Sequence, residues 1–235
     1  MENAGSICGT VYLSTINTYI MKYKFDFALT TYCQAKCRSC ARTNEVTGDK
    51  EDWLELKHMD LGIFQKRLES MQGKDIDYIL FCGEFGDPMM HPQVTDFIQE
   101  SFNYTKNVQI NTNGGLRQPE WYKEQAIKWN TNKNPREGLE IFWGIDGADH
   151  DTNNLYREGV DTDRAYANMR AWFKNGGHGK WAYLIFDWNW MQIPEAAEIA
   201  KDIGCVIEFK FNNRTHGLIT QENKKYAVEF LREVI

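Results

Sequence analysis

Residues 30–42 of the chain read TTYCQAKCRSCAR, in which Cys33, Cys37 and Cys40 follow the spacing C-x3-C-x2-C. Three thiolates this close can converge on one metal centre, because the loop that carries them can wrap around a small inorganic cluster. Iron–sulfur clusters are normally held by four thiolates, so a set of three leaves one iron without a protein ligand. An open coordination position is what separates a catalytic metal site from a structural one. The spacing therefore predicts a cluster that can do chemistry.

Other interpretations of these cysteines are weaker. A disulfide framework is disfavoured, because the chain has six Cys in 235 residues and no secretory signal. A zinc site usually has two paired knuckles, whereas the remaining cysteines are scattered singly, at Cys8, Cys82 and Cys205. Chance clustering of buried core cysteines is the third alternative. Cluster binding remains the interpretation that the pattern favours.

Length, composition and charge narrow the class of protein. With 235 residues, of which 42% are hydrophobic, the chain suits one α/β domain with a sizeable core. No stretch approaches the ~20 apolar residues of a membrane span, and the N-terminus lacks the pattern of a secretory signal. We therefore expect a cytoplasmic, reducing environment and no membrane partner. The net charge of −6, without a Lys- or Arg-rich run, disfavours nucleic acid as a partner.

Short β-rich runs alternate with amphipathic helical patterns along the chain. The runs predict strands at 25–31, 77–82, 107–111, 139–145, 180–187 and 205–211. Helices are expected near 60–71, 92–104, 119–129, 162–174, 193–203 and 220–234. The helix at 193–203 has Pro194 at its start and Gly204 at its end, the usual asymmetry. The polar segment 41–57 predicts a long loop that could hold one helical turn.

This alternation predicts an α/β fold with parallel strands and right-handed crossovers. Six βα units are too few for an eight-stranded barrel and suit a partial (β/α)6 TIM-like barrel, open on one side. We expect an N-terminal extension at 1–24 and one barrel domain at 25–235. In such folds ligands gather at the carboxyl ends of the strands. The residues just after each strand are therefore the candidates for a site.

Two of these strand ends carry glycine-rich turns. After the second strand comes CGEFGDPMMHP, where Gly83 would let a ligand approach the backbone and Glu84 could accept from an ammonium group. After the third comes INTNGG, with Thr112 and Asn113. The alternative for CGEFGDPMMHP is an ordinary βα turn, and the alternative for INTNGG is an Asn-Gly turn.

The later strand ends carry polar groups. In WGIDGADHDTNNLYREG, Asp146 could hold ribose hydroxyls and Arg157 could hold a carboxylate bidentately. Asn189 follows the fifth strand, and FNNRTHG after the sixth adds less specific candidates, Asn212, Asn213 and Arg214. For four of the five histidines, turn or surface roles are favoured: His91, His150, His178 and His216. Several tryptophans crowd one region and could be core or the wall of a cavity: Trp172, Trp181, Trp188 and Trp190.

Over residues 25–211 the chain resembles the radical S-adenosylmethionine (radical SAM) enzymes. Cys33, Cys37 and Cys40 match the cysteine signature of that superfamily. The resemblance implies that they ligate a [4Fe-4S] cluster whose remaining iron is chelated by SAM. In the family, the reduced cluster cleaves SAM to methionine and a 5′-deoxyadenosyl radical, which abstracts hydrogen from substrate. An external one-electron reductant such as flavodoxin or ferredoxin is then an implied partner.

Further motifs of the family match this sequence in part. The Gly-Gly-Glu motif, which contacts the methionine amino group, corresponds to Cys82-Gly83-Glu84, and the Thr-Asn-Gly element to Thr112-Asn113-Gly114. The Ser-Ile-Asp-Gly element of peptide-modifying members corresponds to Gly144-Ile145-Asp146-Gly147. Arg157 matches the Arg that pairs with the methionine carboxylate. The sequence departs from the family at Cys82, at Gly144 and at Ser39, where an aromatic residue near the adenine is usual.

These motifs are most similar to the SPASM/twitch branch, many of whose members modify peptides or proteins. The resemblance therefore favours a peptide or protein substrate. No cysteine lies beyond Cys205, so we expect no auxiliary cluster and a minimal core of that branch. A small metabolite or nucleotide, stacked on Trp188 and Trp190, is the alternative substrate. A protein that binds SAM or a cluster without catalysis is the alternative of another functional class. For Cys82 and Cys205, a core role is favoured over a role as a thiol hydrogen donor.

Overall fold

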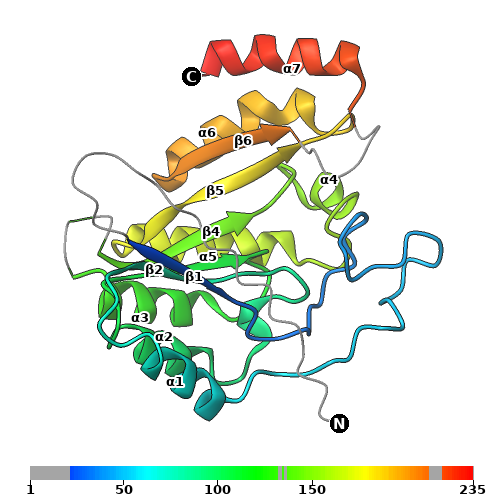
Figure 1. Cartoon of the computed structure of the whole chain (residues 1–235). Coiled ribbons are helices and arrows are strands. Elements are labelled where there is room, and N and C mark those ends of the chain that lie inside the picture. The colour runs from blue at the N-terminus through cyan, green and yellow to red at the C-terminus, as the bar shows by residue number, and fades with distance from the viewer. Residues whose placement is uncertain (1–21, 132–133, 135–136, 212–218, 235) are drawn as a thin grey trace.

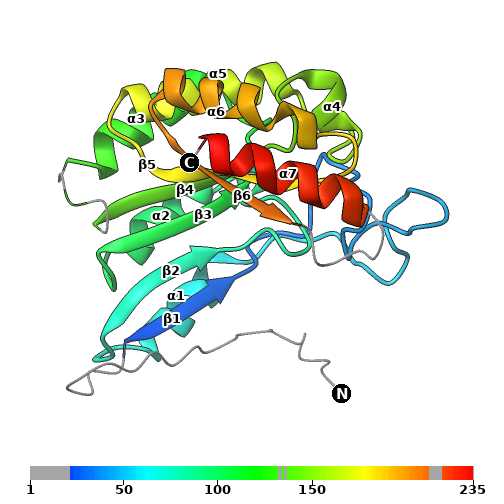
Figure 2. The ribbon, with the colours of Figure 1, turned by 90° about the horizontal axis from the view of Figure 1, so that it is seen from above.

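The computed structural model describes residues 22–131, 134, 137–211 and 219–234. Its centre is one six-stranded sheet, in the order β1-β2-β3-β4-β5-β6, in which all neighbours pair in parallel (Figure 1). Because sequential parallel strands joined by right-handed crossovers keep their helices on one face, the sheet curves with the helices outside it (Figure 2). The predicted α/β partial barrel is confirmed.

The strands are β1 (Tyr23–Phe27), β2 (Ile76–Phe81), β3 (Asn107–Thr112), β4 (Gly138–Gly144), β5 (His178–Ile185) and β6 (Val206–Phe211). The helices are α1 (Leu61–Glu69), α2 (Val94–Ser101), α3 (Pro119–Trp129), α4 (His150–Asn154), α5 (Thr162–Lys174), α6 (Ile193–Ile203) and α7 (Gln221–Val234). Two short 3-10 helices, η1 (Pro88–Met90) and η2 (Trp190–Gln192), follow the ends of β2 and β5.

Local chemistry accounts for the helix boundaries. The side chains of Asp60, Asp149 and Asp161 cap α1, α4 and α5 by accepting from a backbone N–H in the first turn. Proline lies in the first turn of both α3 and α6, where its missing N–H costs no hydrogen bond. Gly204 ends α6 in the left-handed region at φ 78°, as the sequence predicted.

Three local predictions were wrong or incomplete. β1 ends at Phe27 rather than at residue 31, because the chain leaves the sheet there and Thr30 pairs with His58 in an antiparallel bridge. The segment 41–57 contains turns and a bridge between Thr43 and Lys50, and it has no helical turn. The short helix α4 was not predicted.

The core lies between the sheet and its helices. It is rich in aromatic residues, and Phe64 of α1 packs edge-on against Phe27 and tilted against Phe97. Trp172 and Trp181 are fully buried, and each indole N–H donates to a backbone carbonyl. These two tryptophans are therefore core residues.

The opposite, concave face of the sheet is polar. Lys180 and Lys210 both pair with Glu208, at 2.5 and 3.0 Å, and Gln109 donates to Glu140 on the neighbouring strand at 3.4 Å. A closed eight-stranded barrel would fill this space with branched apolar side chains. The charged residues indicate that the inside of this partial barrel is reached by water.

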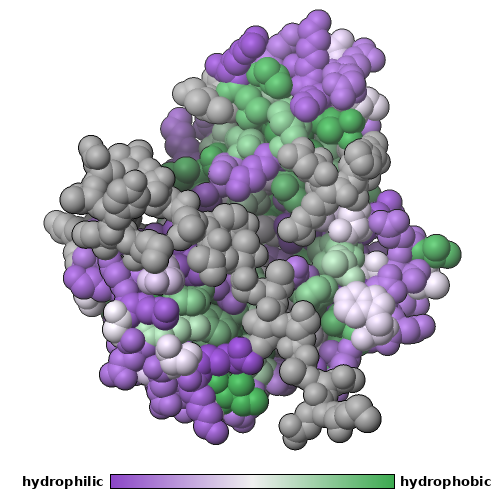
Figure 3. All heavy atoms as spheres, in the orientation of Figure 1, coloured by the Kyte–Doolittle hydropathy of each residue, from purple (hydrophilic) through white to green (hydrophobic). Residues whose placement is uncertain are grey.

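Helix α7 covers the β6 end of the sheet. It is amphipathic, with hydrophilic side chains outward and hydrophobic ones toward α6 and η2 (Figure 3). Trp190 of η2 stacks on Tyr226 and Phe230 of α7. Over the described ranges, no helix combines the length and apolar character that crossing a bilayer needs.

Replacing Gly179 with Ala tests the pairing of β4 with β5. Gly179 has φ 128°, and a Cβ there would lie 2.0 Å from the carbonyl oxygen of Ile141. Gly176→Ala is the matched control, since Gly176 also has positive φ (86°) but has nothing within 4 Å of a Cβ. We expect chemical denaturation to show a loss of about 1 kcal/mol for the control and about 3 kcal/mol or more for Gly179→Ala. Equal losses would contradict this register.

Candidate metal and cofactor site

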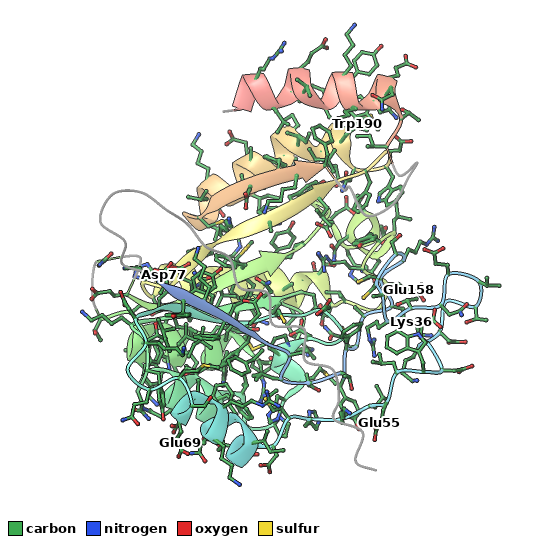
Figure 4. The ribbon with its side chains drawn as sticks, in the orientation of Figure 1. Lys36, Glu55, Glu69, Asp77, Glu158 and Trp190 are labelled. Carbon is green, nitrogen blue, oxygen red and sulfur yellow. The ribbon has the colours of Figure 1, made fainter. Side chains whose placement is uncertain are left out.

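The cysteine loop, residues 28–42, leaves the carboxyl end of β1 and has turns but no helix or strand. Cys33, Cys37 and Cys40 are free thiols, each half-buried. Figure 4 shows Lys36 of this loop beside Glu158, at the end of the sheet opposite Asp77, which lies near the start of β2. The three cysteines therefore lie where parallel α/β folds bind their ligands.

The turn after β2 holds the first part of the loop. The N–H of Asp87 donates to the carbonyl of Tyr32 at 2.9 Å. The two segments approach so closely that a Cβ on Gly86 would lie 2.3 Å from the Thr30 carbonyl oxygen and 2.7 Å from that of Tyr32. Only glycine fits this crossing.

The end of β3 and the segment between α4 and α5 hold the middle of the loop. Gln34 donates its amide to Asn113 Oδ1 at 2.6 Å, and Asn113 Nδ2 lies 3.9 Å from the sulfur of Cys33. The N–H of Lys36 donates to the carbonyl of Glu158 at 2.8 Å, next to Arg157. The segments directly after β2 and β3, and the segment that follows α4, thus all contact one short loop.

Asp87 is a site residue that the sequence prediction missed. Its buried carboxylate accepts from the hydroxyl of Thr112 at 2.9 and 3.0 Å, and from the backbone N–H groups of Asn113 and Met89 at 2.8 and 2.9 Å. Burial raises the pKa of Asp87, and these hydrogen bonds offset part of the rise. The available signal was an Asp directly before Pro88, which is a helix N-cap pattern.

The carboxyl end of β4 carries the buried pair of Asp146 and Arg157. Asp146 Oδ2 accepts from Arg157 Nε at 2.6 Å, and Oδ1 accepts from the N–H of Leu184 at 2.7 Å. The Nη atoms of Arg157 have no hydrogen-bond partner in the described part of the chain. A Cβ on Gly144 would lie 2.7 Å from Arg157 Nη2. Glycine at position 144 therefore leaves room for the guanidinium, which explains the departure from Ser in physical terms.

Burial dominates the acid–base behaviour of two cysteines. It raises the pKa of Cys33 to about 12, with a further rise from the charge of Asp87 and a partial offset from the Ala35 N–H. It raises the pKa of Cys37 to about 11, and Arg157 offsets part of this rise. These two thiols are protonated at neutral pH without a metal, so binding iron must release their protons.

The three cysteines suit a cluster rather than a single metal ion. Among the residues described, no three His, Cys, Asp or Glu side chains gather closely enough to hold one metal ion, so the expected convergence on a single centre is not seen. A [4Fe-4S] cluster takes one thiolate on each of several irons, so its cysteines surround a body rather than meet at a point. Three free thiols on one loop suit such a cluster, since thiolates are the ligands that iron–sulfur centres select.

Glu84 and Gly83 are exposed beside the cysteine loop. Glu84 lines a surface cavity of about 690 Å³. The other residues that line it belong to the cysteine loop and the segment after it: Ser39, Cys40, Ala41, Thr43, Asn44, Glu45, Val46 and Glu51. The structure therefore brings the predicted Glu84 together with one of the three cysteines.

The side chains of other predicted residues form hydrogen bonds within the protein. Asn189 is fully buried and donates to the carbonyls of Asp146 and Leu184 at 2.9 and 2.8 Å, while its Oδ1 accepts from the N–H of Phe186 at 2.7 Å. Thr112 is engaged by Asp87. These contacts position strand ends, and direct contact of either residue with a cofactor stays a prediction. Asn212, Asn213, Arg214, His216 and Cys8 lie outside the described residues.

Two of the tryptophans named in the sequence analysis, Trp188 and Trp190, follow the end of β5. Trp188 stacks on Phe186 at 4.7 Å between ring centroids, and Trp190 is stacked against α7. His91 has a turn role, with Nδ1 accepting from the N–H of Gln93 at 3.1 Å and Nε2 lying 3.0 Å from the carbonyl of Met59.

The chain was compared with known proteins. No family model and no curated protein sequence matches it. Its backbone is similar to SuiB of Streptococcus suis bound to S-adenosylmethionine, with 14% identity and a TM-score of 0.63 over 91% of this chain and 49% of SuiB. It is also similar to anSMEcpe with bound AdoMet, with 12% identity and a TM-score of 0.65 over 89% of this chain and 60% of anSMEcpe. A third similar structure is the methylornithine synthase PylB, with 10% identity and a TM-score of 0.55 over 90% of this chain and 62% of PylB.

The chain has the fold of these three proteins, an α/β partial barrel with a parallel sheet. It spans about half the length of SuiB. At these identities the likeness shows the fold alone.

Replacing Asp87 with Asn tests the hydrogen bonds beneath the site. Asn keeps the shape of the side chain, but its NH2 group replaces one carboxylate oxygen. A donor then faces the buried donors of Thr112, Asn113 or Met89, and one of them loses its acceptor. We expect the free energy of unfolding to fall by about 1–3 kcal/mol in chemical denaturation. The control Asp52→Asn makes the same substitution at an exposed position in the segment after the cysteine loop and should change stability by less than about 0.5 kcal/mol. A variant as stable as the control would contradict the role given to Asp87.

Proposed function

We propose that this protein is a radical SAM enzyme with a [4Fe-4S] cluster on Cys33, Cys37 and Cys40. The observation that carries the proposal is the cysteine loop itself, in which three free thiols are held at the carboxyl edge of the sheet by the turns after β2 and β3 and by the segment between α4 and α5. When bound and reduced, the cluster supplies the electron that cleaves SAM and generates the radical. The chain contributes binding, orientation and exclusion of water.

Arg157 is proposed to bind the carboxylate of SAM. Its Nε is engaged by Asp146, which fixes the guanidinium plane, and the Nη atoms are without a partner among the described residues. Its side chain is 18% exposed, so a ligand can reach it. A planar guanidinium held in this way is suited to bidentate binding of a carboxylate.

The remaining SAM contacts are proposed from the strand ends. Glu84, with Gly83 beside it, is available to accept from the ammonium group of SAM, because it is exposed next to Cys40 and unpaired within the described residues. The fully buried Asp146 is proposed to act by holding Arg157, and Gly144 leaves room for that guanidinium. Asn113 lies beside Cys33. Thr112 and Asn189 are proposed to act by holding Asp87 and Asp146 in place, through the bonds described above.

A peptide or protein is the proposed substrate, and residues 25–235 the proposed catalytic domain. SuiB has been solved bound to the precursor peptide SuiA, and anSMEcpe with the Cp18Cys peptide. The cavity beside Cys40 is lined by strongly exposed residues such as Val46, so an extended chain can reach it. An external one-electron reductant, such as flavodoxin or ferredoxin, is the proposed electron donor.

The proposed activity is tested by anaerobic reconstitution with iron and sulfide, followed by reduction with dithionite and addition of SAM. We expect 5′-deoxyadenosine to form, as measured by liquid chromatography. A protein that carries a full cluster and binds SAM but forms no 5′-deoxyadenosine would refute the enzymatic proposal. One equivalent of zinc with no iron would favour a zinc-binding module.

Replacing Cys37 with Ala removes one proposed thiolate ligand. We expect the reconstituted variant to lose both the iron–sulfur absorbance and the formation of 5′-deoxyadenosine. Cys205→Ala is the matched control, because Cys205 is also half-buried but packs against the core near α6. Normal iron content in Cys37→Ala, or an equal loss in the control, would argue against this assignment.

Replacing Arg157 with Lys separates binding of SAM from binding of the cluster. Lys keeps the charge beside Asp146 but lacks the planar fork, so we expect the Kd for SAM to rise about tenfold, or about 1.4 kcal/mol. Iron content should be unchanged. Arg164→Lys is the control, since Arg164 makes an exposed ion pair with Asp161. Isothermal titration of the reconstituted proteins would measure this, and unchanged affinity in Arg157→Lys would exclude the proposed contact.

A further inference from the structure

Arg42 lies two residues after Cys40, and its side chain turns back against the cysteine loop. Nη1 donates to the carbonyls of Cys33 and Ala35 at 3.3 and 3.1 Å, and Nη2 donates to the carbonyl of Thr31 at 3.3 Å. The side chain is buried, with 8% of the residue exposed. One guanidinium thus ties the end of the cysteine stretch to three carbonyls at its start.

This contact matters because the cysteine loop has no regular structure. Its carbonyls cannot be satisfied by a helix or sheet ladder, and buried carbonyls need donors. Two hydrogen bonds order the second half of the loop. The N–H of Cys40 donates to the carbonyl of Cys37 at 3.2 Å, and the N–H of Thr43 donates to the carbonyl of Cys40 at 2.9 Å. Arg42 orders the first half. A lysine in its place has one nitrogen and cannot reproduce the planar fork.

Arg42 also carries a positive charge without a counter-ion. No carboxylate lies within ion-pair distance of it among the described residues, whereas Arg157 pairs with Asp146. Its Nε is buried and has no acceptor. A buried charge and a buried donor without partners are both costly, so the arrangement calls for negative charge nearby. The cysteine loop, which Arg42 bonds at three carbonyls, is where such charge appears when its thiols bind iron.

We infer that Arg42 is a positioning residue for the cluster, an inference that rests on the proposed function. It holds the loop in the shape that presents the three thiols, and it stabilises the negative charge that the cluster gains on reduction. Both effects have measurable consequences. Loss of the hydrogen bonds lowers cluster retention, and loss of the charge makes the reduction potential more negative.

The test compares Arg42→Met and Arg42→Lys with wild type, and Arg38→Met as the matched control. Arg38 lies in the same loop but is exposed, with no hydrogen bond or ion pair in the described chain. Each protein is reconstituted with iron and sulfide, and circular dichroism checks its fold. Iron content after gel filtration reports retention. A dithionite titration followed by electron paramagnetic resonance reports the potential of the fraction that carries a cluster.

We expect Arg42→Met to retain about tenfold less iron or worse, and to show a more negative potential. Arg42→Lys should also lose iron but keep a potential close to that of wild type, because it keeps the charge. Arg38→Met should match wild type in both measurements. If Arg42→Met does not fold, the contrast between iron loss and retained potential in Arg42→Lys decides the question.

Two results would overturn the inference. One is full iron retention in the Arg42 variants. The other is the same potential in Arg42→Met as in wild type, which would leave Arg42 a structural clamp alone. Failure of the wild type itself to take up an iron–sulfur cluster is a different outcome, because it would refute the proposed function rather than the role of Arg42.

Discussion

The site depends on one constraint: the cysteine loop has no helix or strand, so its buried backbone groups must find partners elsewhere. The parallel sheet supplies them, because the turns after β2 and β3 and the segment between α4 and α5 all lie at the same edge. Asp87 bonds the loop at Tyr32, Asn113 bonds Gln34, and the Glu158 carbonyl bonds Lys36. The position of the thiols is therefore a property of the whole sheet rather than of the loop alone.

Buried charges surround this loop, and each is held differently. The carboxylate of Asp87 is stabilised by hydrogen bonds from three groups. Asp146 is paired with Arg157, whose outer nitrogens stay available. Arg42 is bonded only to carbonyls and keeps its full positive charge. Such an arrangement suits a site that binds both an anionic cluster and a zwitterionic ligand, because each needs charge of opposite sign in a fixed place.

Much of the fold could be predicted from the sequence, because the βα alternation is regular and the helices carry clear caps. Helices α3, α5 and α6 were predicted to the residue where proline, aspartate or glycine marks their ends. The end of β1 could not be predicted, since residues 28–31 are β-rich and leave the sheet only because Thr30 pairs with the distant His58. Asp87, Arg42 and the space beside Gly144 depend on contacts between segments far apart in sequence, which local patterns do not contain.

The central claim is that SAM binds directly at a cluster held by Cys33, Cys37 and Cys40. The most direct measurement is the electron paramagnetic resonance spectrum of the reduced, reconstituted protein before and after SAM is added. If SAM occupies the open coordination position, the spectrum of the reduced cluster changes in wild type, and Cys37→Ala shows no such signal. An unchanged spectrum in a wild-type sample that binds SAM by titration would contradict the account.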